Sequence, residues 1–259
     1  MNIGVSTASF YPLETELALE KIGKFGIKNT ELFFNAESEL KDSFTDMLLD
    51  IKERYGINIA SIHPTMSLAE SFMIFSAYER RFYESQEIFS RYSEIAAKLG
   101  AKYIILHGGK PNGILSDEEY CERYMKLKSR TLKNGVTLLQ ENVANFRSGD
   151  IEFLRSMREI LKDDAEFCID IKQCIRRGLL PLEVIEEFID NTRHFHLSDH
   201  SAAGDCLLPG KGNFNFKDFL SFAKQKNYNG SGLIEVYSNA YKSYDEINES
   251  YEFLQNIDC

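Results

Sequence analysis

The sequence predicts a single (β/α)8 barrel over residues 1–259, in which helices cover a closed ring of parallel strands. Short apolar runs alternate eight times with longer amphipathic stretches, as expected for a parallel sheet covered by helices. Several amphipathic stretches end at a glycine directly before the next run, as at Gly26 and Gly100, where helices commonly stop. The 259 residues, 43% of them hydrophobic, are enough to build one large core.

The apolar runs are the predicted strands, and most are too apolar to have a solvent-facing side. In order they are Ile3–Thr7, Thr30–Phe34, Ile57–Ile62, Tyr103–Leu106, Val136–Leu139, Glu166–Ile169, His194–Leu197 and Gly232–Val236. The predicted helices are Leu17–Phe25, Phe44–Tyr55, Arg80–Leu99, Glu118–Lys133, Ile151–Leu161, Pro181–Ile189, Phe216–Lys226 and Tyr244–Leu254. No glycine-rich turn follows the first strand, which argues against an open nucleotide-binding sheet.

Composition and charge favour a small-molecule partner. The formal net charge is −10, whereas proteins that bind nucleic acid usually present a basic face. The five cysteines are scattered without a Cys-x-x-Cys pair, unlike a disulfide framework or a structural zinc motif. No signal-peptide pattern is visible, and no apolar run approaches the ~18 residues that would span a bilayer. We therefore expect a cytoplasmic protein without a membrane or nucleic-acid partner, and leave homo-oligomers open.

The C-terminal ends of the predicted strands carry the chemistry, because the active sites of such barrels lie at that rim. Six acidic or imidazole residues follow successive strands at intervals of 26 to 44 residues: His63, His107, Glu141, Asp170, His196 and Glu235. Converging side chains of this kind would repel one another and lose solvation unless a cation neutralised them. The mixed oxygen and nitrogen ligands suit Mn²⁺, Co²⁺, Zn²⁺, Mg²⁺ or Fe²⁺. His194 is expected to face away from His196 and to be structural.

Five short segments make nearly the whole chain resemble the xylose isomerase-like TIM barrels, in particular the sugar phosphate isomerase/epimerase branch related to endonuclease IV. They are Leu139-Gln140-Glu141-Asn142, Ile169-Asp170-Ile171-Lys172-Gln173, His196-Leu197-Ser198-Asp199, Pro209-Gly210-Lys211-Gly212-Asn213-Phe214 and Ile234-Glu235-Val236. The resemblance implies that Glu141, Asp170, His196 and Glu235 hold one divalent ion. It also implies that Glu141 and Glu235 are catalytic: one removes a proton beside a carbonyl, and the other returns a proton to the opposite face of a metal-stabilised enediolate.

The resemblance leaves the number of ions at one or two. Endonuclease IV-type barrels hold a larger cluster that uses two earlier histidines, and His63 and His107 occupy those positions as ligands for a second ion or as substrate contacts. A third ion would need a histidine where this chain has Gln173, which can still bind a substrate hydroxyl. It would also need a ligand pair where only Asp205 is a good oxygen ligand, next to Cys206. The three-ion cluster is therefore expected to be incomplete.

Loop residues at the rim are expected to set specificity. Lys172, Arg176 and Arg177 follow the sixth strand, and Lys211 in a Gly-Lys-Gly turn either binds a substrate phosphate or is ordinary surface. The backbone of 107–110 offers N–H groups for an anion. The segment 64–77 either caps the pocket or buries a subunit interface, and its apolar residues are Met66, Phe72, Met73 and Phe75. Asp199 either orients a ligand or caps a turn.

These patterns predict a metal-dependent isomerase or epimerase of a sugar or sugar phosphate. The enzymatic alternative is a hydrolase or lyase of the same fold, such as a dehydratase or an endonuclease IV-like phosphodiesterase. Phosphodiester cleavage benefits from several ions and a basic surface, so the incomplete cluster and acidic balance disfavour it. A non-catalytic barrel that binds a metal or a ligand is the alternative from another functional class.

Overall fold

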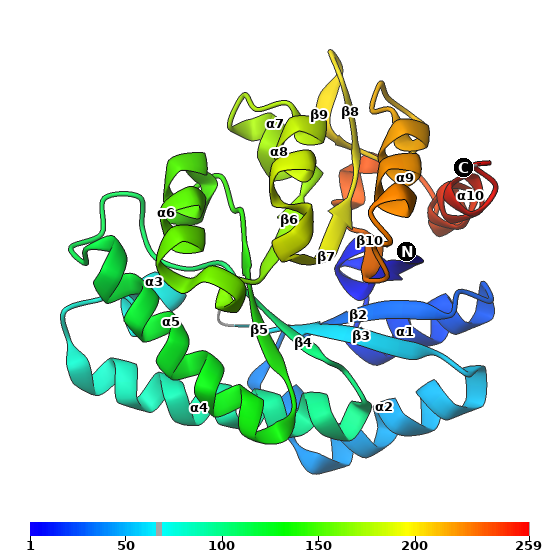
Figure 1. Ribbon diagram of the computed structural model, residues 1–259. Coiled ribbons are helices and arrows are strands. Elements are labelled where there is room, and N and C mark those ends of the chain that lie inside the picture. The colour runs from blue at the N-terminus through cyan, green and yellow to red at the C-terminus, as the bar shows by residue number, and fades with distance from the viewer. Residues whose placement is uncertain (66–68, 259) are drawn as a thin grey trace.

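The computed structural model of the protein describes residues 1–65 and 69–258, and it is a closed parallel barrel surrounded by helices (Figure 1). The strands neighbour one another in the order β1, β10, β7, β6, β5, β4, β3 and β2, and β1 closes the ring by pairing with β10 and β2. The predicted (β/α)8 fold is confirmed. The barrel strands are β1 Asn2–Ser6, β2 Asn29–Phe33, β3 Asn58–His63, β4 Tyr103–Leu106, β5 Thr137–Glu141, β6 Phe167–Asp170, β7 Thr192–Leu197 and β10 Ser231–Ile234.

All eight predicted helices are present, and two shorter ones accompany them. The helices are α1 Thr15–Lys24, α2 Asp42–Tyr55, α3 Glu70–Met73, α4 Glu79–Leu99, α5 Asp117–Thr131, α6 Ile151–Leu161, α7 Ile171–Arg176, α8 Pro181–Phe188, α9 Phe216–Gln225 and α10 Tyr244–Gln255. Short 3-10 turns are η1 Thr7–Phe10, η2 Glu37–Leu40, η3 Leu132–Asn134, η4 Arg147–Gly149, η5 Lys162–Asp164, η6 Ile189–Asn191 and η7 Ser238–Ala240. The helices α3 and α7 follow β3 and β6 at the rim, where the sequence had indicated only loops.

Local signals explain where the helices begin and end. Gly26 and Gly100 follow α1 and α4 with φ angles of 78° and 80°, in the left-handed region that glycine adopts most readily. At the start of α5, Ser116 accepts a hydrogen bond from the Glu119 N–H while the Glu119 carboxylate accepts one from the Ser116 N–H. These signals fix where α1 and α4 end and where α5 begins.

The interior of the barrel is apolar on one side and polar on the other. Ile105, Leu139 and Cys168 form a small buried cluster on β4, β5 and β6. Each lies two residues before a rim residue, so it shares the inner face of its strand with His107, Glu141 or Asp170. The opposite side of the interior is polar and is described with the site, because it lies directly beneath it.

Beyond β7 the chain forms a ribbon of two antiparallel strands that the sequence did not predict, β8 Asp199–Ser201 and β9 Gly204–Leu207. It projects beside α7 (Figure 1). The Asp199 carboxylate accepts hydrogen bonds from four backbone N–H groups, including those of Gly210 and Gly212, so it organises this loop. The sequence left open whether Asp199 orients a ligand or caps a turn, and its contacts are those of a turn cap.

Among the described residues, Cys121, Cys168, Cys174 and Cys206 are free and buried, whereas Cys259 lies outside them. None of the described helices is both long and apolar enough to cross a membrane.

Candidate metal centre

The four residues predicted to hold an ion converge at the C-terminal rim of the barrel. Glu141 and Asp170 are the last residues of β5 and β6, His196 is the penultimate residue of β7, and Glu235 directly follows β10. Each offers one ligand atom, and these four atoms all lie within 4.8 Å of one another. We call these residues the quartet. Asp170 and His196 are fully buried, and Glu141 is 2% exposed.

The quartet has the geometry of a cation site. His196 Nδ1 lies 3.2 Å from Glu141 Oε1, 3.4 Å from Glu235 Oε2 and 3.9 Å from Asp170 Oδ2. Separations of this size leave room for one ion at about 2.0–2.2 Å from each ligand. Three carboxylates buried side by side also need positive charge. The residues therefore fit a divalent ion on donor type, distance and charge.

A second group of potential ligands adjoins the quartet through Glu141. Its Oε2 atom lies 3.0 Å from His107 Nε2 and 3.8 Å from His63 Nε2, and these two nitrogens are 2.9 Å apart. His63, His107 and Glu141 thus form a second set of atoms that could hold an ion. Burial raises the pKa of Glu141, but the pull of His107, His196 and His63 outweighs it, so the pKa lies well below its ordinary value.

The other nitrogen of His196 contacts a residue that sequence reasoning missed. His196 Nε2 lies 3.3 Å from Glu31 Oε1 and 3.4 Å from Oε2, in the middle of β2. Glu31 is fully buried and accepts hydrogen bonds from the Ser6 and Ser61 hydroxyls, at 3.2 and 2.7 Å. Burial raises the pKa of Glu31, but His196, His194 and His63 hold it far below its ordinary value, so Glu31 is ionised. The only sequence signal was a glutamate inside an otherwise β-forming run.

The prediction that His194 faces away from His196 is wrong. Both side chains are fully buried, their ring centroids are 5.2 Å apart, and His194 Nε2 lies 3.5 Å from Glu31 Oε2. Residues two apart on a strand share a face, and the end of β7 does not twist enough to separate these two. Phe195 between them packs against Phe219 on the helix side. Burial lowers the pKa of His194 to about 4, so its ring is neutral.

Lys172 is part of the site rather than of a surface loop. It is the second residue of α7, its side chain is 3% exposed, and its Nζ atom lies 3.0 Å from both Asp170 Oδ2 and Glu235 Oε2. Burial raises the pKa of Asp170 to about 6, against the lowering effect of Lys172 and with further raising by Glu141 and Glu235. The ammonium of Lys172 therefore supplies positive charge to carboxylates that an ion would share.

The remaining predicted residues lie at different distances from the quartet. Gln173 lines the same cavity, and its Oε1 atom accepts a hydrogen bond from the Ala144 N–H at 3.0 Å. Asp205 pairs with Arg176, whose Nη1 also donates to the Tyr237 hydroxyl.

Lys211 is half exposed, and its closest carboxylate is that of Glu249, at 4.0 Å. Arg177 is exposed at the end of α7, and Cys206 is buried. The structure thus brings Gln173 to the quartet's cavity and places Asp205 and Lys211 apart from it.

The backbone that was expected to bind an anion is occupied by the protein's own carboxylate. Glu70 on α3 accepts hydrogen bonds from the N–H groups of His107 and Gly108, both at 2.7 Å. Glu70 is fully buried, and burial raises its pKa to about 8. The anion-site prediction is therefore wrong for these two groups, since the Glu70 carboxyl group already accepts both hydrogen bonds.

Within the segment 64–77, Phe75 stacks on Tyr120 with ring centroids 3.9 Å apart, and Phe72 is half exposed beneath the Lys110 ammonium. Met73 is partly buried and packs on the core. Met66 lies outside the described residues.

A cavity of about 420 Å³ opens directly over the quartet. It is lined by Ala8, Tyr11, Phe33, Asn35, His63, His107, Glu141, Lys172, Gln173, Glu235, Val236, Tyr237 and Ser238. Glu141 and Glu235 reach this cavity, whereas Asp170 and His196 lie behind its wall. A small ligand would therefore meet two carboxylates, two imidazoles and an ammonium group on a partly apolar surface.

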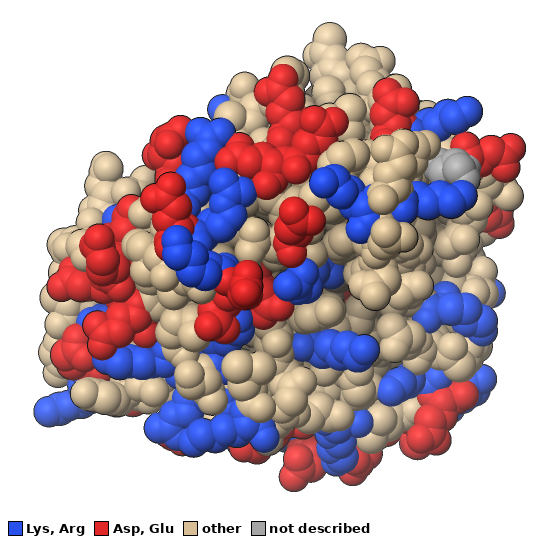
Figure 2. Space-filling view, viewed as in Figure 1, with Lys and Arg blue, Asp and Glu red and all other residues tan. Residues whose placement is uncertain are grey.

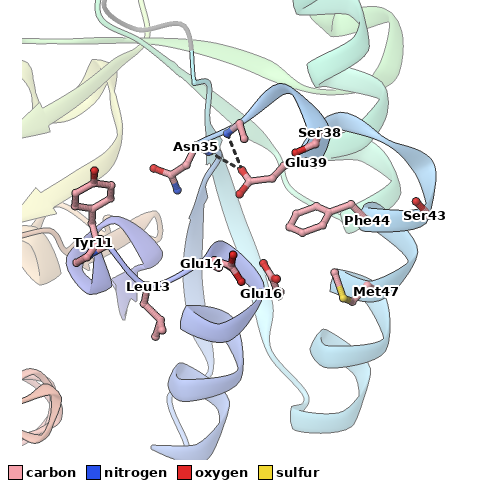
Figure 3. A pocket seen from close by; sticks show the side chains of 12 residues that line it. Tyr11, Leu13, Glu14, Glu16, Asn35, Ser38, Glu39, Ser43, Phe44 and Met47 are labelled. Carbon is pink, nitrogen blue, oxygen red and sulfur yellow. Dashed lines mark hydrogen bonds between the residues drawn. The ribbon is translucent and has the colours of Figure 1, made fainter.

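A second cavity of about 440 Å³ lies beside the first and shares Tyr11 and Asn35 with it. Figure 3 shows Phe44 and Met47 of α2 on one side of it and Tyr11 and Leu13 on the other. The Glu39 carboxylate within it accepts hydrogen bonds from the Asn35 and Ala36 N–H groups, as the dashed lines show. That carboxylate therefore fixes the loop after β2.

Comparison with known proteins agrees with the barrel fold. The family described as "Xylose isomerase-like TIM barrel" matches residues 19–257. An uncharacterized protein of Mycobacterium leprae is 22% identical over 285 aligned positions, covering 98% of this chain and 97% of that protein.

Among solved structures, a D-tagatose 3-epimerase-like protein aligns with a TM-score of 0.75 and 22% identity, over 98% of each chain. D-psicose 3-epimerase, solved in the presence of D-fructose, aligns with a TM-score of 0.78 and 14% identity, over 99% of each chain. At these identities, the two structures establish a shared fold.

Proposed function

Because the chain belongs to the xylose isomerase-like TIM barrel family, we propose that it is a divalent metal-dependent isomerase or epimerase of a sugar or sugar phosphate. The observation that carries the proposal is the division of the quartet. Glu141 and Glu235 line the cavity, while Asp170 and His196 are buried behind it. In this proposal two residues hold an ion only, and two both hold it and meet a substrate.

Within this proposal each side chain has a defined task. A divalent ion held by the quartet would supply Lewis-acid stabilisation of negative charge on the substrate oxygens. Glu141 and Glu235 both have pKa values below the ordinary range: burial opposes this, but His107 near Glu141, and His196 and Lys172 near Glu235, overcome it. Ionised carboxylates accept protons, so one takes the proton from the carbon beside a carbonyl. The other returns a proton, taken up from solvent before the step, to the resulting enediolate, and exchange with solvent afterwards restores both carboxyl groups.

The cavity walls suit a sugar-sized molecule. Phe33, Tyr11 and Tyr237 supply rings on which the apolar face of a sugar can lie, and Gln173 and Asn35 supply amide groups for hydroxyls. The apolar part of this surface limits the water that can protonate the enediolate at the wrong position.

A hydrolase or lyase of the same fold is the second candidate, and the group formed by His63, His107 and Glu141 favours it. Two ions sharing Glu141 would suit displacement at phosphorus or elimination. Figure 2 shows lysine and arginine interspersed with acidic residues on the face in view, without one continuous basic surface. That distribution, with the net charge of −10, supports a small substrate over a nucleic acid.

The proposal is tested by proton exchange. The purified protein, loaded in turn with Mn²⁺, Co²⁺, Zn²⁺, Mg²⁺ or Fe²⁺, is incubated with a panel of ketoses and ketose phosphates in D₂O, and carbon-bound deuterium is followed by NMR. We expect exchange beside the carbonyl of at least one substrate, and its loss in Glu141→Gln and Glu235→Gln. Glu159→Gln, an exposed position on α6, is the matched control and should exchange like the wild type.

Two results would redirect the assignment. Metal-dependent nicking of abasic-site DNA at turnover rates, without ketose exchange, would make the protein a phosphodiesterase. Metal binding without exchange, elimination or hydrolysis on any substrate would favour the non-catalytic barrel.

A further inference from the structure

Lys172 places an ammonium group against two of the four proposed metal ligands. Its Nζ atom is 3.0 Å from Asp170 Oδ2 and 3.0 Å from Glu235 Oε2. These are the same oxygens that lie 3.9 and 3.4 Å from His196 Nδ1, on the side where an ion would bind. The ammonium and the ion would therefore share both oxygens.

The fold holds Lys172 in this position through helix α7 and the ring of Tyr237. Helix α7 begins directly after β6, and the Asp170 carboxylate caps it by accepting a hydrogen bond from the Gln173 N–H at 3.2 Å. The first turn of α7 thereby brings Lys172 back over the strand end. The ring of Tyr237 lies 5.0 Å from Nζ, and the Arg176 guanidinium donates to the hydroxyl of Tyr237 at 3.0 Å. Since the side chain of Lys172 is 3% exposed, water screens its charge little.

The charges of the site give this ammonium a role. The three carboxylates of the quartet carry one more negative charge than a divalent ion neutralises, and Lys172 supplies the missing positive charge. Transfer of the proton from a neutral sugar to Glu141 or Glu235 leaves the total charge unchanged and moves one negative charge from that carboxylate to the substrate oxygens. That charge on the substrate is less costly when Lys172 offsets one negative charge of the quartet, because the surroundings have a low dielectric constant.

We propose that Lys172 is a built-in cation of the metal centre. It competes with a divalent ion for Asp170 Oδ2 and Glu235 Oε2, and it offsets one negative charge of the quartet while the substrate loses its proton. This inference rests on the proposed function. It makes Lys172 a residue that weakens metal binding yet assists proton transfer, and no purely structural role has that pair of effects.

The test is the affinity for Mn²⁺, measured by isothermal titration of the metal-free protein. In Lys172→Met, which keeps a long side chain without charge, we expect Mn²⁺ to bind at least about tenfold more tightly than in the wild type, because a nearby like charge is removed. Lys172→Arg keeps the charge and should stay within a few-fold of the wild type. Lys24→Met removes an exposed ammonium on α1 and is the matched control, with unchanged affinity expected. On any ketose that exchanges deuterium, Lys172→Met saturated with Mn²⁺ should exchange more slowly than the wild type.

Weaker or unchanged Mn²⁺ binding in Lys172→Met, with normal binding in the wild type, would overturn the inference and leave Lys172 as a support for its two neighbours. If Lys172→Met does not fold, Lys172→Gln is measured in its place with the same expectation. Absence of Mn²⁺ binding in the wild type and in Lys172→Met alike would instead remove the metal centre, and the proposed function with it.

Discussion

Replacing Glu31 by glutamine should weaken metal binding even though Glu31 does not reach the cavity. His196 directs Nδ1 at the quartet and Nε2 at Glu31, so the ring can bind an ion through Nδ1 only while Nε2 carries the proton. The Glu31 carboxylate accepts that proton, whereas an amide at this position accepts it less strongly or donates to Nε2 and disfavours the required tautomer. The perturbation therefore acts through the orientation and protonation of one ligand.

The expected size follows from the contacts that change. Ser6 and Ser61 keep their hydroxyls and can hydrogen-bond to the amide, so the main loss is one charge-assisted hydrogen bond, worth about 1.5–3 kcal/mol. Outer partners of metal-bound histidines typically contribute about 10- to 100-fold in affinity, which is about 1.4–2.7 kcal/mol. We expect Mn²⁺ to bind Glu31→Gln at least about tenfold more weakly than the wild type.

The assay is competition between the protein and a fluorescent chelator for Mn²⁺, with urea unfolding of each metal-free variant alongside. Ser61→Ala removes a neighbouring hydroxyl but keeps the carboxylate, and should lose far less affinity. Glu31→Asp, which retains the charge, should recover part of the loss. Equal Mn²⁺ affinity in Glu31→Gln and the wild type would refute the reasoning, because His196 would then bind without help from Glu31.

Three further predictions follow from buried charges. Burial raises the pKa of Asp170 in the metal-free protein to about 6, so below that pH an ion must displace a proton from this carboxyl group. The affinity for Mn²⁺ should therefore fall about tenfold per pH unit below pH 6. Constant affinity in titrations between about pH 5 and 7 would contradict this. The pKa of Glu70 is raised to about 8, so its contribution to stability is lost as pH rises through 8. Glu70→Gln should therefore abolish a loss of about 1.4 kcal/mol per pH unit that the wild type shows in urea unfolding between about pH 4.5, the ordinary pKa, and pH 8. Arg123 is buried and donates hydrogen bonds to the carbonyls of Ile74 and Ser76, so it anchors this segment to α5. Arg123→Met should lower the free energy of unfolding by about 2–3 kcal/mol and speed proteolysis near residue 75. An unchanged cleavage rate would exclude this anchoring role.

The strand ends were predictable because position along the chain alone defines them. A polar residue directly after an apolar run must lie at the C-terminal rim of a parallel barrel, and the rim brings such residues together whatever the details of packing. Glu141, Asp170, His196 and Glu235 could therefore be grouped from the sequence. Their exact contacts, and the approach of His63 and His107 to Glu141, depend on the radius of the barrel and the rotamers, which the sequence pattern does not contain.

Residues that act on the site from other places were missed for a physical reason. Glu31 lies in the middle of β2, and its inward direction depends on the register shift between β2 and β3 at Thr30 and Glu31. Lys172 follows Asp170 by two residues and looked like loop sequence, because the short helix that turns it inward has too few residues for a detectable period. Glu70 lies in a segment whose sequence pattern is apolar. The His107 N–H group that donates a hydrogen bond to it follows β4, far away in the chain.

The polar half of the barrel interior is best understood as a support for His196. A fully buried carboxylate is costly unless it accepts hydrogen bonds and lies near positive charge. Glu31 meets this condition through the hydroxyls of Ser6 and Ser61 and the ring of His196. The other side of the interior needs no such arrangement, because Glu141 and Asp170 stand above apolar Leu139 and Cys168 and are balanced at the rim itself. His196 is the one ligand of the quartet that has no negative charge to attract an ion, and a carboxylate beneath it increases the basicity of Nδ1. The need to support His196 accounts for the presence of Glu31 beneath it. It also predicts that a change at Glu31 alters metal binding, and that metal binding alters the environment of Glu31.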